Sequence, residues 1–129
     1  MKRVLILDND QDVLEVMKEA FSYEGFEVET ILHTENIFVQ INHYKPDVIL
    51  IDYLLNGING GEICHQIKVN PSTNQLPVML VSAYPRVLQS LGLYGCDAFI
   101  AKPFDLDNLI NTVNQLTGTA QAQAHTYLD

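Results

Sequence analysis

Cysteine, basic side chains and long apolar runs are scarce in this sequence. Its 129 residues include two cysteines, Cys64 and Cys96, which show no metal-type spacing. The sequence has no signal-peptide pattern at its start, and no apolar run is long enough to cross a membrane. We therefore expect a cytoplasmic protein without a membrane segment, in which both cysteines are small, buried apolar residues in a reducing compartment.

The shortage of basic residues also limits the choice of partners. The chain has 7 lysines and arginines against 16 aspartates and glutamates, which gives a formal net charge of −9 at pH 7. Such a charge repels the phosphates of nucleic acids, so direct binding of DNA or RNA is not expected. The length predicts one domain, and a chain of this size buries enough surface to form a core without metal ions or disulfides.

Short aliphatic runs are what the sequence has in place of long ones. Four consecutive aliphatic residues, 48–51, lie between Asp47 and Asp52 and predict a central parallel strand that is covered on both faces. Residues 4–7 repeat this pattern, whereas residues 26–31 alternate, as in a more exposed strand near the sheet edge. Two further buried strands are predicted at 77–81 and 98–101.

Helical periodicity follows each predicted strand. The first helix carries apolar residues at helical spacing from Val13 to Phe21, is capped by Asp10 and ends at Gly25. Thr34 is predicted to cap the second helix. Three further helices are predicted near 61–69, around 86–93, and over 106–116 after a cap at Asp105. Five alternations of strand and helix imply an α/β fold, a doubly wound parallel sheet with right-handed crossovers and helices on both faces.

The end of the sequence differs from the rest. Residues 117–129 carry only Tyr127 and Leu128 as bulky apolar groups. We therefore expect a domain over residues 1–116, followed by a flexible tail over residues 117–129.

Polar side chains stand where four of the predicted strands end. They are Asp8 with Asn9, then Asp52, Ser82 and Lys102. Because parallel strands deliver their carboxyl ends to one edge of a sheet, we expect these side chains to converge there. Carboxylate and carboxamide oxygens suit Mg²⁺, while the lysine adds a positive charge and the serine a hydroxyl donor. This combination is typical of phosphoryl transfer, in which charge neutralisation and positioning supply most of the catalysis.

Residues 1–116 resemble the receiver domain of two-component response regulators. Residues 4–10 are similar to the family's apolar strand followed by an acidic pair, and residues 48–52 to the strand that bears the phosphoacceptor. Residues 56–60 resemble the loop usually written Pro-Gly-x-Asp-Gly. Residues 81–83 and 99–104 resemble the strand-end hydroxyl and the aromatic switch with its Lys-Pro-Phe end. The resemblance implies a flavodoxin-like (βα)5 sheet with strand order 2-1-3-4-5.

The resemblance also implies a role for each site residue. Asp52 would accept a phosphoryl group from a histidine kinase or a histidine phosphotransfer protein. Asp8, Asn9, the Asp52 carboxylate and the backbone carbonyl of Leu54 would hold Mg²⁺. The residues that would bind the phosphoryl group or take part in the switch are Ser82, Ala83, Phe99, Lys102 and Pro103.

The expected output of this chemistry is a changed protein surface. Phosphorylation would draw in the Ser82 hydroxyl and the Ala83 N–H, Phe99 would rotate inward, and the face of the fourth helix, fifth strand and fifth helix would change. That face would bind a downstream effector protein or a second copy of the chain. No enzymatic activity is expected beyond self-phosphorylation and autodephosphorylation.

The sequence departs from the family pattern at several positions. Asn9 replaces the second member of the acidic pair, and because a carboxamide is neutral we expect weaker Mg²⁺ binding. Asn56 and Asn59 replace the usual Pro and Asp of the loop, whose shape we expect to survive. The stretch between Ser82 and Lys102 is shorter than is typical.

Three other interpretations remain open at this point. A degenerate receiver could act only as a docking module, as Asn9 allows. A haloacid dehalogenase-type phosphatase would use Asp8 as nucleophile and Asp10 as acid, and turnover of a generic phosphate ester would reveal it. A flavodoxin-like electron carrier would have the same sheet topology, but a purified protein without colour would count against it.

Overall fold

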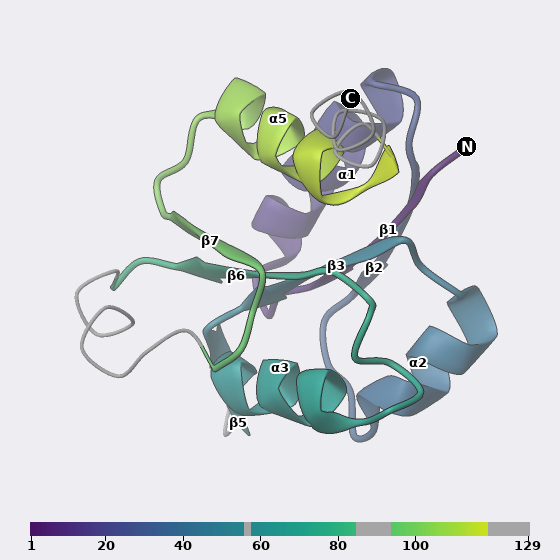
Figure 1. Cartoon of the computed structure of the whole chain (residues 1–129). Helices are drawn as coiled ribbons and strands as arrows, with labels where there is room; N and C mark the ends of the chain where they lie inside the picture. Colours follow the sequence, from purple (N-terminus) through teal and green to yellow (C-terminus); the bar gives the residue numbers. More distant parts are fainter. Residues whose placement is uncertain (56–57, 85–93, 119–129) are drawn as a thin grey trace, which may run out of the picture.

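The computed structural model describes residues 1–55, 58–84 and 94–118, which form a central parallel sheet with helices on both faces (Figure 1). The strands are β1 (Arg3–Leu7), β2 (Glu27–Ile31), β3 (Val48–Asp52), β6 (Val78–Ser82) and β7 (Ala98–Ala101). The helices are α1 (Gln11–Tyr23), α2 (Ile37–Tyr44), α3 (Gly60–Val69) and α5 (Leu106–Leu116). The predicted α/β fold is confirmed.

The order of the strands follows the predicted topology. The sheet reads β2-β1-β3-β6-β7, with every neighbouring pair parallel. A separate antiparallel pair, β4 (Leu54–Leu55) with β5 (Ile58–Asn59), interrupts the numbering, and without it the order is 2-1-3-4-5. This small pair was not predicted. β2 lies at an edge of the sheet and its residues are half-buried or exposed, as its alternating sequence indicates.

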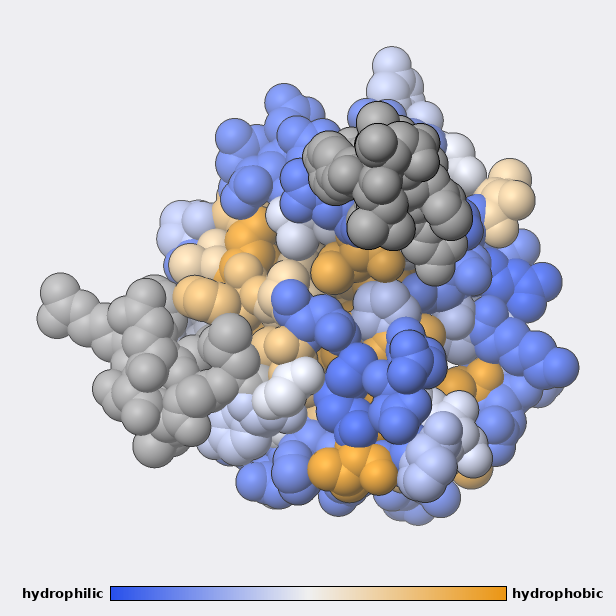
Figure 2. Space-filling view, in the orientation of Figure 1, coloured by the Kyte–Doolittle hydropathy of each residue, from blue (hydrophilic) through white to orange (hydrophobic). Residues whose placement is uncertain are grey.

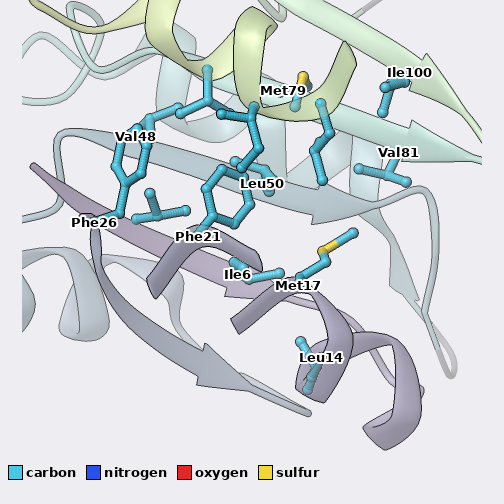
Figure 3. Close-up of a cluster of buried hydrophobic side chains, with 14 residues drawn as sticks. Ile6, Leu14, Met17, Phe21, Phe26, Val48, Leu50, Met79, Val81 and Ile100 are labelled. Carbon is cyan, nitrogen blue, oxygen red and sulfur yellow. The ribbon is translucent and has the colours of Figure 1, made fainter. Parts of the chain in front are cut away.

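Side chains of the central strand alternate between two hydrophobic clusters. Val48 and Leu50 pack with α1 and α5 on one face, and Ile49 and Ile51 pack with α2 and α3 on the other. All five residues of β3 are buried because both faces are covered. Figure 3 shows the first cluster, where the rings of Phe21 and Phe26 meet edge to face with their centroids 5.4 Å apart.

Helix starts depend on short polar side chains. The Asp10 carboxylate accepts hydrogen bonds from the backbone N–H groups of Asp12 and Val13, so it caps α1 as predicted. The predicted cap of α2 at Thr34 is wrong. Asn36 is the N-cap of α2, whereas the Thr34 hydroxyl accepts the backbone N–H of Asn36, two residues too early for a cap.

Further sequence-based predictions concern α5, the end of the domain and the helix before β7. Asp105 caps α5 as predicted. Thr117 is buried and its backbone N–H donates to the Val113 carbonyl, so the C-cap of α5 packs with the domain beyond the predicted end at Leu116. The predicted helix at 86–93 lies outside the described residues, as do Asn56 of the loop and residues 119–129.

The described surface is polar with scattered apolar side chains. In the view of Figure 2, hydrophobic residues emerge as small separate patches among hydrophilic ones. Over the described residues, no helix is both long enough and apolar enough to span a membrane.

Candidate functional site

The carboxyl ends of β1, β3 and β7 bring three charged side chains to one edge of the sheet. Asp8 directly follows β1, Asp52 is the last residue of β3, and Lys102 directly follows β7. The Lys102 ammonium lies 3.0 Å from Oδ2 of Asp8 and 3.1 Å from Oδ1 of Asp52. A single lysine therefore bridges two carboxylates that come from different strands.

Burial strengthens the interactions among the charges of Asp8, Asp52 and Lys102. Asp8 is 2% exposed and Asp52 is 7% exposed. Burial, and then the nearby negative charge of Asp8, raise the pKa of Asp52 above its ordinary value, while Lys102 works against both. Burial also works to lower the pKa of Lys102, but the hydrogen bonds and charges of the two carboxylates outweigh it, so this pKa is raised. The site therefore holds two carboxylates that repel one another across a shared cation.

The two oxygens of Asp8 are held in fixed positions. Oδ1 accepts the backbone N–H of Asp10 at 2.9 Å, and Oδ2 accepts Lys102. Asp10 itself turns its carboxylate to the start of α1. A phosphatase mechanism of the haloacid dehalogenase type needs Asp10 as an acid beside Asp8. The Asp10 carboxylate instead accepts the N–H groups at the start of α1, which argues against that mechanism.

The donor set at this edge fits Mg²⁺. Asp8 and Asp52 supply two carboxylates that face one cationic group, and Asn9 is exposed immediately beside Asp8. Within the described ranges, no group of three or more His, Cys, Asp or Glu side chains is placed to hold a metal ion. Two carboxylates completed by amide or carbonyl oxygens and water are what Mg²⁺ accepts, so Asp8, Asn9, Asp52 and the Leu54 carbonyl would form such a site.

The remaining predicted residues lie around this group at differing depths. Ser82 ends β6 and is 1% exposed, and its Oγ accepts the backbone N–H of Tyr84 at 2.9 Å. Ala83 is exposed next to it. Phe99 is half-buried and packs with the cluster on the α2 and α3 face, paired in register with Leu80. Pro103 is exposed, and its peptide bond with Lys102 is cis.

A hydrogen-bonded tyrosine pair beside Asp52 was not predicted. The hydroxyl oxygens of Tyr53 and Tyr94 lie 3.4 Å apart, and the Asn59 side-chain amide donates to both. The side-chain oxygen of Asn59, Oδ1, accepts the Gly61 N–H, and this bond caps α3. The sequence offered only a local signal, the Asn59-Gly60-Gly61 segment at the start of α3. This signal does not indicate a contact with Tyr94.

The start of α3 is also pressed closely against β3. A Cβ at Gly60 would overlap the backbone carbonyl of Asp52. Only glycine permits this approach, and it lets the Gly60 N–H donate to the Tyr53 carbonyl at 2.8 Å. This hydrogen bond thus joins Tyr53, directly after β3, to the start of α3.

Sequence comparison identifies the family. A family model described as the response regulator receiver domain matches residues 4–114, which is most of the chain. The chain belongs to this family. As a receiver domain, it is a signalling domain of the two-component type.

Curated relatives of this receiver domain are response regulators. The nisin biosynthesis regulatory protein NisR of Lactococcus lactis subsp. lactis is 35% identical, over 86% of this chain and 48% of its own. The phosphate regulon transcriptional regulatory protein PhoB of Rhizobium meliloti is 25% identical, over 95% of this chain and 55% of its own. This receiver domain spans about half the length of these relatives.

Solved structures agree on the fold. The response regulator protein TrrA of Thermotoga maritima, in complex with Mg²⁺-BeF, is 27% identical and superposes with a TM-score of 0.80, covering 90% of this chain and 99% of that one. The chemotaxis response regulator CheY4 of Vibrio cholerae, at 20% identity and a TM-score of 0.79, shares the fold, covering 90% of this chain and 98% of that one.

Proposed function

We propose that Asp52 is the phosphoacceptor of this receiver domain and that Mg²⁺ supports the transfer. The donor is a phosphohistidine of a histidine kinase or a histidine phosphotransfer protein. An Asp52 carboxylate oxygen attacks the phosphorus, the new O–P bond forms, and the N–P bond breaks with its electron pair returning to the imidazole. The product is an acyl phosphate on Asp52 and a free histidine on the donor.

The observation that carries this proposal is the Lys102 bridge. The ammonium is 3.1 Å from Asp52 and 3.0 Å from Asp8. The ammonium can stay paired with oxygens on Asp52 as the carboxylate becomes an acyl phosphate, and so offset the negative charge that the transfer adds. Bound Mg²⁺ supplies further charge neutralisation at the phosphoryl oxygens.

The same contacts support Asp52, and not Asp8, as the nucleophile. Both oxygens of Asp8 accept hydrogen bonds, from the Asp10 N–H and from Lys102, and its side chain is less exposed than that of Asp52. Asp8 is therefore suited to orient a cation. Asp8, Asn9, Asp52 and the Leu54 carbonyl are the proposed Mg²⁺ ligands.

We further propose that phosphorylation is converted into a changed binding surface. The phosphoryl oxygens draw in the Ser82 hydroxyl and the Ala83 N–H, and Phe99 moves inward with them, next to Lys102 and Pro103. The affected face, of the fourth helix, fifth strand and fifth helix, binds a downstream effector or a second copy of the chain. The fourth helix lies outside the described residues.

Other parts of the proposal concern the chain as a whole. The receiver unit occupies residues 1–116 together with Thr117, which is buried and bonded to Val113, so that any flexible tail begins after Thr117. The protein is cytoplasmic and has no enzymatic activity apart from its own phosphorylation and dephosphorylation. Its net charge of −9 argues against direct contact of this domain with nucleic acid.

Reaction with acetyl phosphate and Mg²⁺ tests the proposal. Intact-mass measurement is expected to find one phosphoryl group on the wild type and none on Asp52→Asn. The matched control is Asp12→Asn, which removes an exposed carboxylate in the first turn of α1 and is expected to be phosphorylated like the wild type. Equal phosphorylation of Asp52→Asn and the wild type would overturn the assignment.

A further inference from the structure

The two cysteines of the chain lie together, away from the phosphoacceptor edge. Cys64 is on α3 and fully buried, and Cys96 lies two residues before β7 and is half-buried. Both cysteines are free, and both pack with the same hydrophobic cluster. The sequence spacing of the pair gave no reason to expect this contact.

Two contacts on either side of the pair fix the approach of α3 to the segment that carries Cys96. The Cys64 thiol donates to the Tyr94 carbonyl at 3.8 Å. One turn further along α3, the Lys68 ammonium lies 2.9 Å from the Asp97 carboxylate. Since residues four apart lie on one face of a helix, that face is tied to Tyr94, two residues before Cys96, and to Asp97, directly after it. The fold therefore holds the face of α3 that carries Cys64 against the segment that carries Cys96.

The two thiols differ in reactivity. The neighbouring Cys64 side chain lowers the pKa of Cys96, helped by the backbone of Leu80 and Ala98, although burial works against it. The neighbouring Cys96 side chain, together with burial, raises the pKa of Cys64. The thiolate is the nucleophilic form, and Cys96 is also the more accessible sulfur. Cys96 is thus suited to react first and Cys64 to react second.

We propose that Cys64 and Cys96 form a peroxide-sensitive thiol pair that closes to an intramolecular disulfide. The Cys96 thiolate attacks hydrogen peroxide, an S–O bond forms, the O–O bond breaks and hydroxide leaves, so Cys96 becomes a sulfenic acid. The Cys64 sulfur then attacks the Cys96 sulfur, the S–O bond breaks, and the hydroxyl leaves as water with the Cys64 proton. Two electrons pass from the two thiols to peroxide, and a thiol reductant reverses the reaction.

The bond would tie α3 to the strand that leads to the phosphoacceptor site. α3 begins at Gly60, against the Asp52 carbonyl, and β7 ends directly before Lys102. Reversible, redox-sensing disulfides are the kind that occur in reducing compartments.

Oxidation of the full chain tests the proposal independently of phosphorylation. The reduced protein is treated with hydrogen peroxide, its remaining thiols are alkylated, and the intact mass is measured. We expect the wild type to lose two hydrogens and to take up no alkyl group, with both thiols restored by dithiothreitol. Two alkylated thiols after oxidation, or a disulfide between two chains in place of the internal one, would overturn the proposal.

Single variants assign the order of the two steps. Cys64→Ser is expected to trap a sulfenic acid at Cys96, detected with dimedone, and Cys96→Ser is expected to leave Cys64 unoxidised. Because Cys64 is fully buried, Cys64→Ala serves in its place if the serine variant fails to fold. A sulfenic acid at Cys64 in Cys96→Ser, formed as fast as the one at Cys96, would refute the order.

The rate of disulfide formation tests the geometry itself. Held in contact, the thiols should close at least about tenfold faster in the native chain than in the same chain in denaturing urea. Equal rates in the native and denatured chain would mean that the fold does not organise the pair, and the proposal would fail.

Discussion

The ammonium of Lys102 lies 3.1 Å from Oδ1 of Asp52, although fifty residues of chain separate them, because β3 and β7 end at the same edge of one parallel sheet. The same ammonium pairs with Asp8. The protonation of Asp52 therefore depends on two charged neighbours of opposite sign. Replacing a charged neighbour of Asp52 should therefore change its protonation measurably.

Replacing Lys102 is expected to raise the pKa of Asp52. Lys102 is the neighbour that lowers this pKa, and burial and Asp8 raise it, so Lys102→Met leaves only the raising effects. The side-chain carbon resonance of Asp52, followed through a pH titration, measures the change. Lys68→Met removes an ammonium that pairs with Asp97 instead, and it is expected to leave the titration of Asp52 unaltered. The same midpoint in Lys102→Met and the wild type would contradict the electrostatic account.

Asp52→Asn is expected to stabilise the fold at neutral pH. The pKa of Asp52 is raised in the folded state, so the stability that its protonated form contributes is present below the ordinary value of 3.8 and is lost as the pH rises through the folded pKa. The neutral amide keeps that contribution, so Asp52→Asn should be more stable than the wild type at pH 7. Urea unfolding at several pH values measures it.

The pH dependence of that gain is the sharper test. The difference between Asp52→Asn and the wild type should vanish as the pH falls below 3.8, where both side chains are neutral. Asp12→Asn should instead lose a few tenths of a kcal/mol at neutral pH, because an acidic residue in the first turn favours the helix. A gain for Asp52→Asn that persists undiminished in acid would exclude ionisation as its cause.

Substituting Gly60 is expected to cost more stability than substituting the next residue. In Gly60→Ala the new Cβ meets the backbone carbonyl of Asp52, which cannot move without shifting β3. In Gly61→Ala the Cβ meets the ring of Tyr94, a half-buried side chain that can turn away. We expect roughly 1–3 kcal/mol for Gly60→Ala and less for Gly61→Ala, by chemical unfolding. The reverse order would mean that the Tyr94 ring is held more firmly than the strand.

Asn9→Asp is expected to bind Mg²⁺ more tightly than the wild type. Asn9 offers a neutral oxygen beside Asp8, and a third negative charge raises the attraction for a hard cation, by about tenfold in affinity. Isothermal titration calorimetry gives the dissociation constants. Gln11→Glu adds the same charge at an exposed position in the first turn of α1, and it should change the affinity far less. Equal dissociation constants for Asn9→Asp and the wild type would refute a ligand role for residue 9.

Tyr94→Phe is expected to lower the pKa of Tyr53 toward its ordinary value of 10.0. The hydrogen bond with Tyr94 is the main cause of the raised pKa of Tyr53, and burial is the second. The ring carbon that bears the Tyr53 hydroxyl reports the titration by NMR. Tyr23→Phe, at a side chain that is 89% exposed, is the control. An unchanged pKa for Tyr53 in Tyr94→Phe would mean that the two hydroxyls do not interact.

Much of the edge that carries Asp8, Asp52 and Lys102 was predictable because it depends on topology. Aliphatic runs followed by Asp8 and Asp52 predict buried parallel strands, and parallel strands place such residues together whatever their separation in the chain. Lys102 follows by the same argument. The lysine bridge confirms the predicted convergence of these three residues.

The parts that were missed depend on contacts that no local pattern encodes. Thr34 and Asn36 are both good capping residues, and the choice between them is made by where the chain leaves β2. The contact of Tyr94 with Tyr53, and the packing of Cys64 and Cys96 with one cluster, join segments whose side chains carry no periodic or motif signal. Only the folded chain brings them together.

The most direct test of the central claim is to locate the phosphoryl group. After reaction with acetyl phosphate and Mg²⁺, borohydride reduces an aspartyl phosphate to homoserine, and peptide mass spectrometry identifies its position. The account predicts reduction at position 52, with Asp8 and Asp10 intact. Reduction at Asp8, with position 52 unmodified, would contradict it.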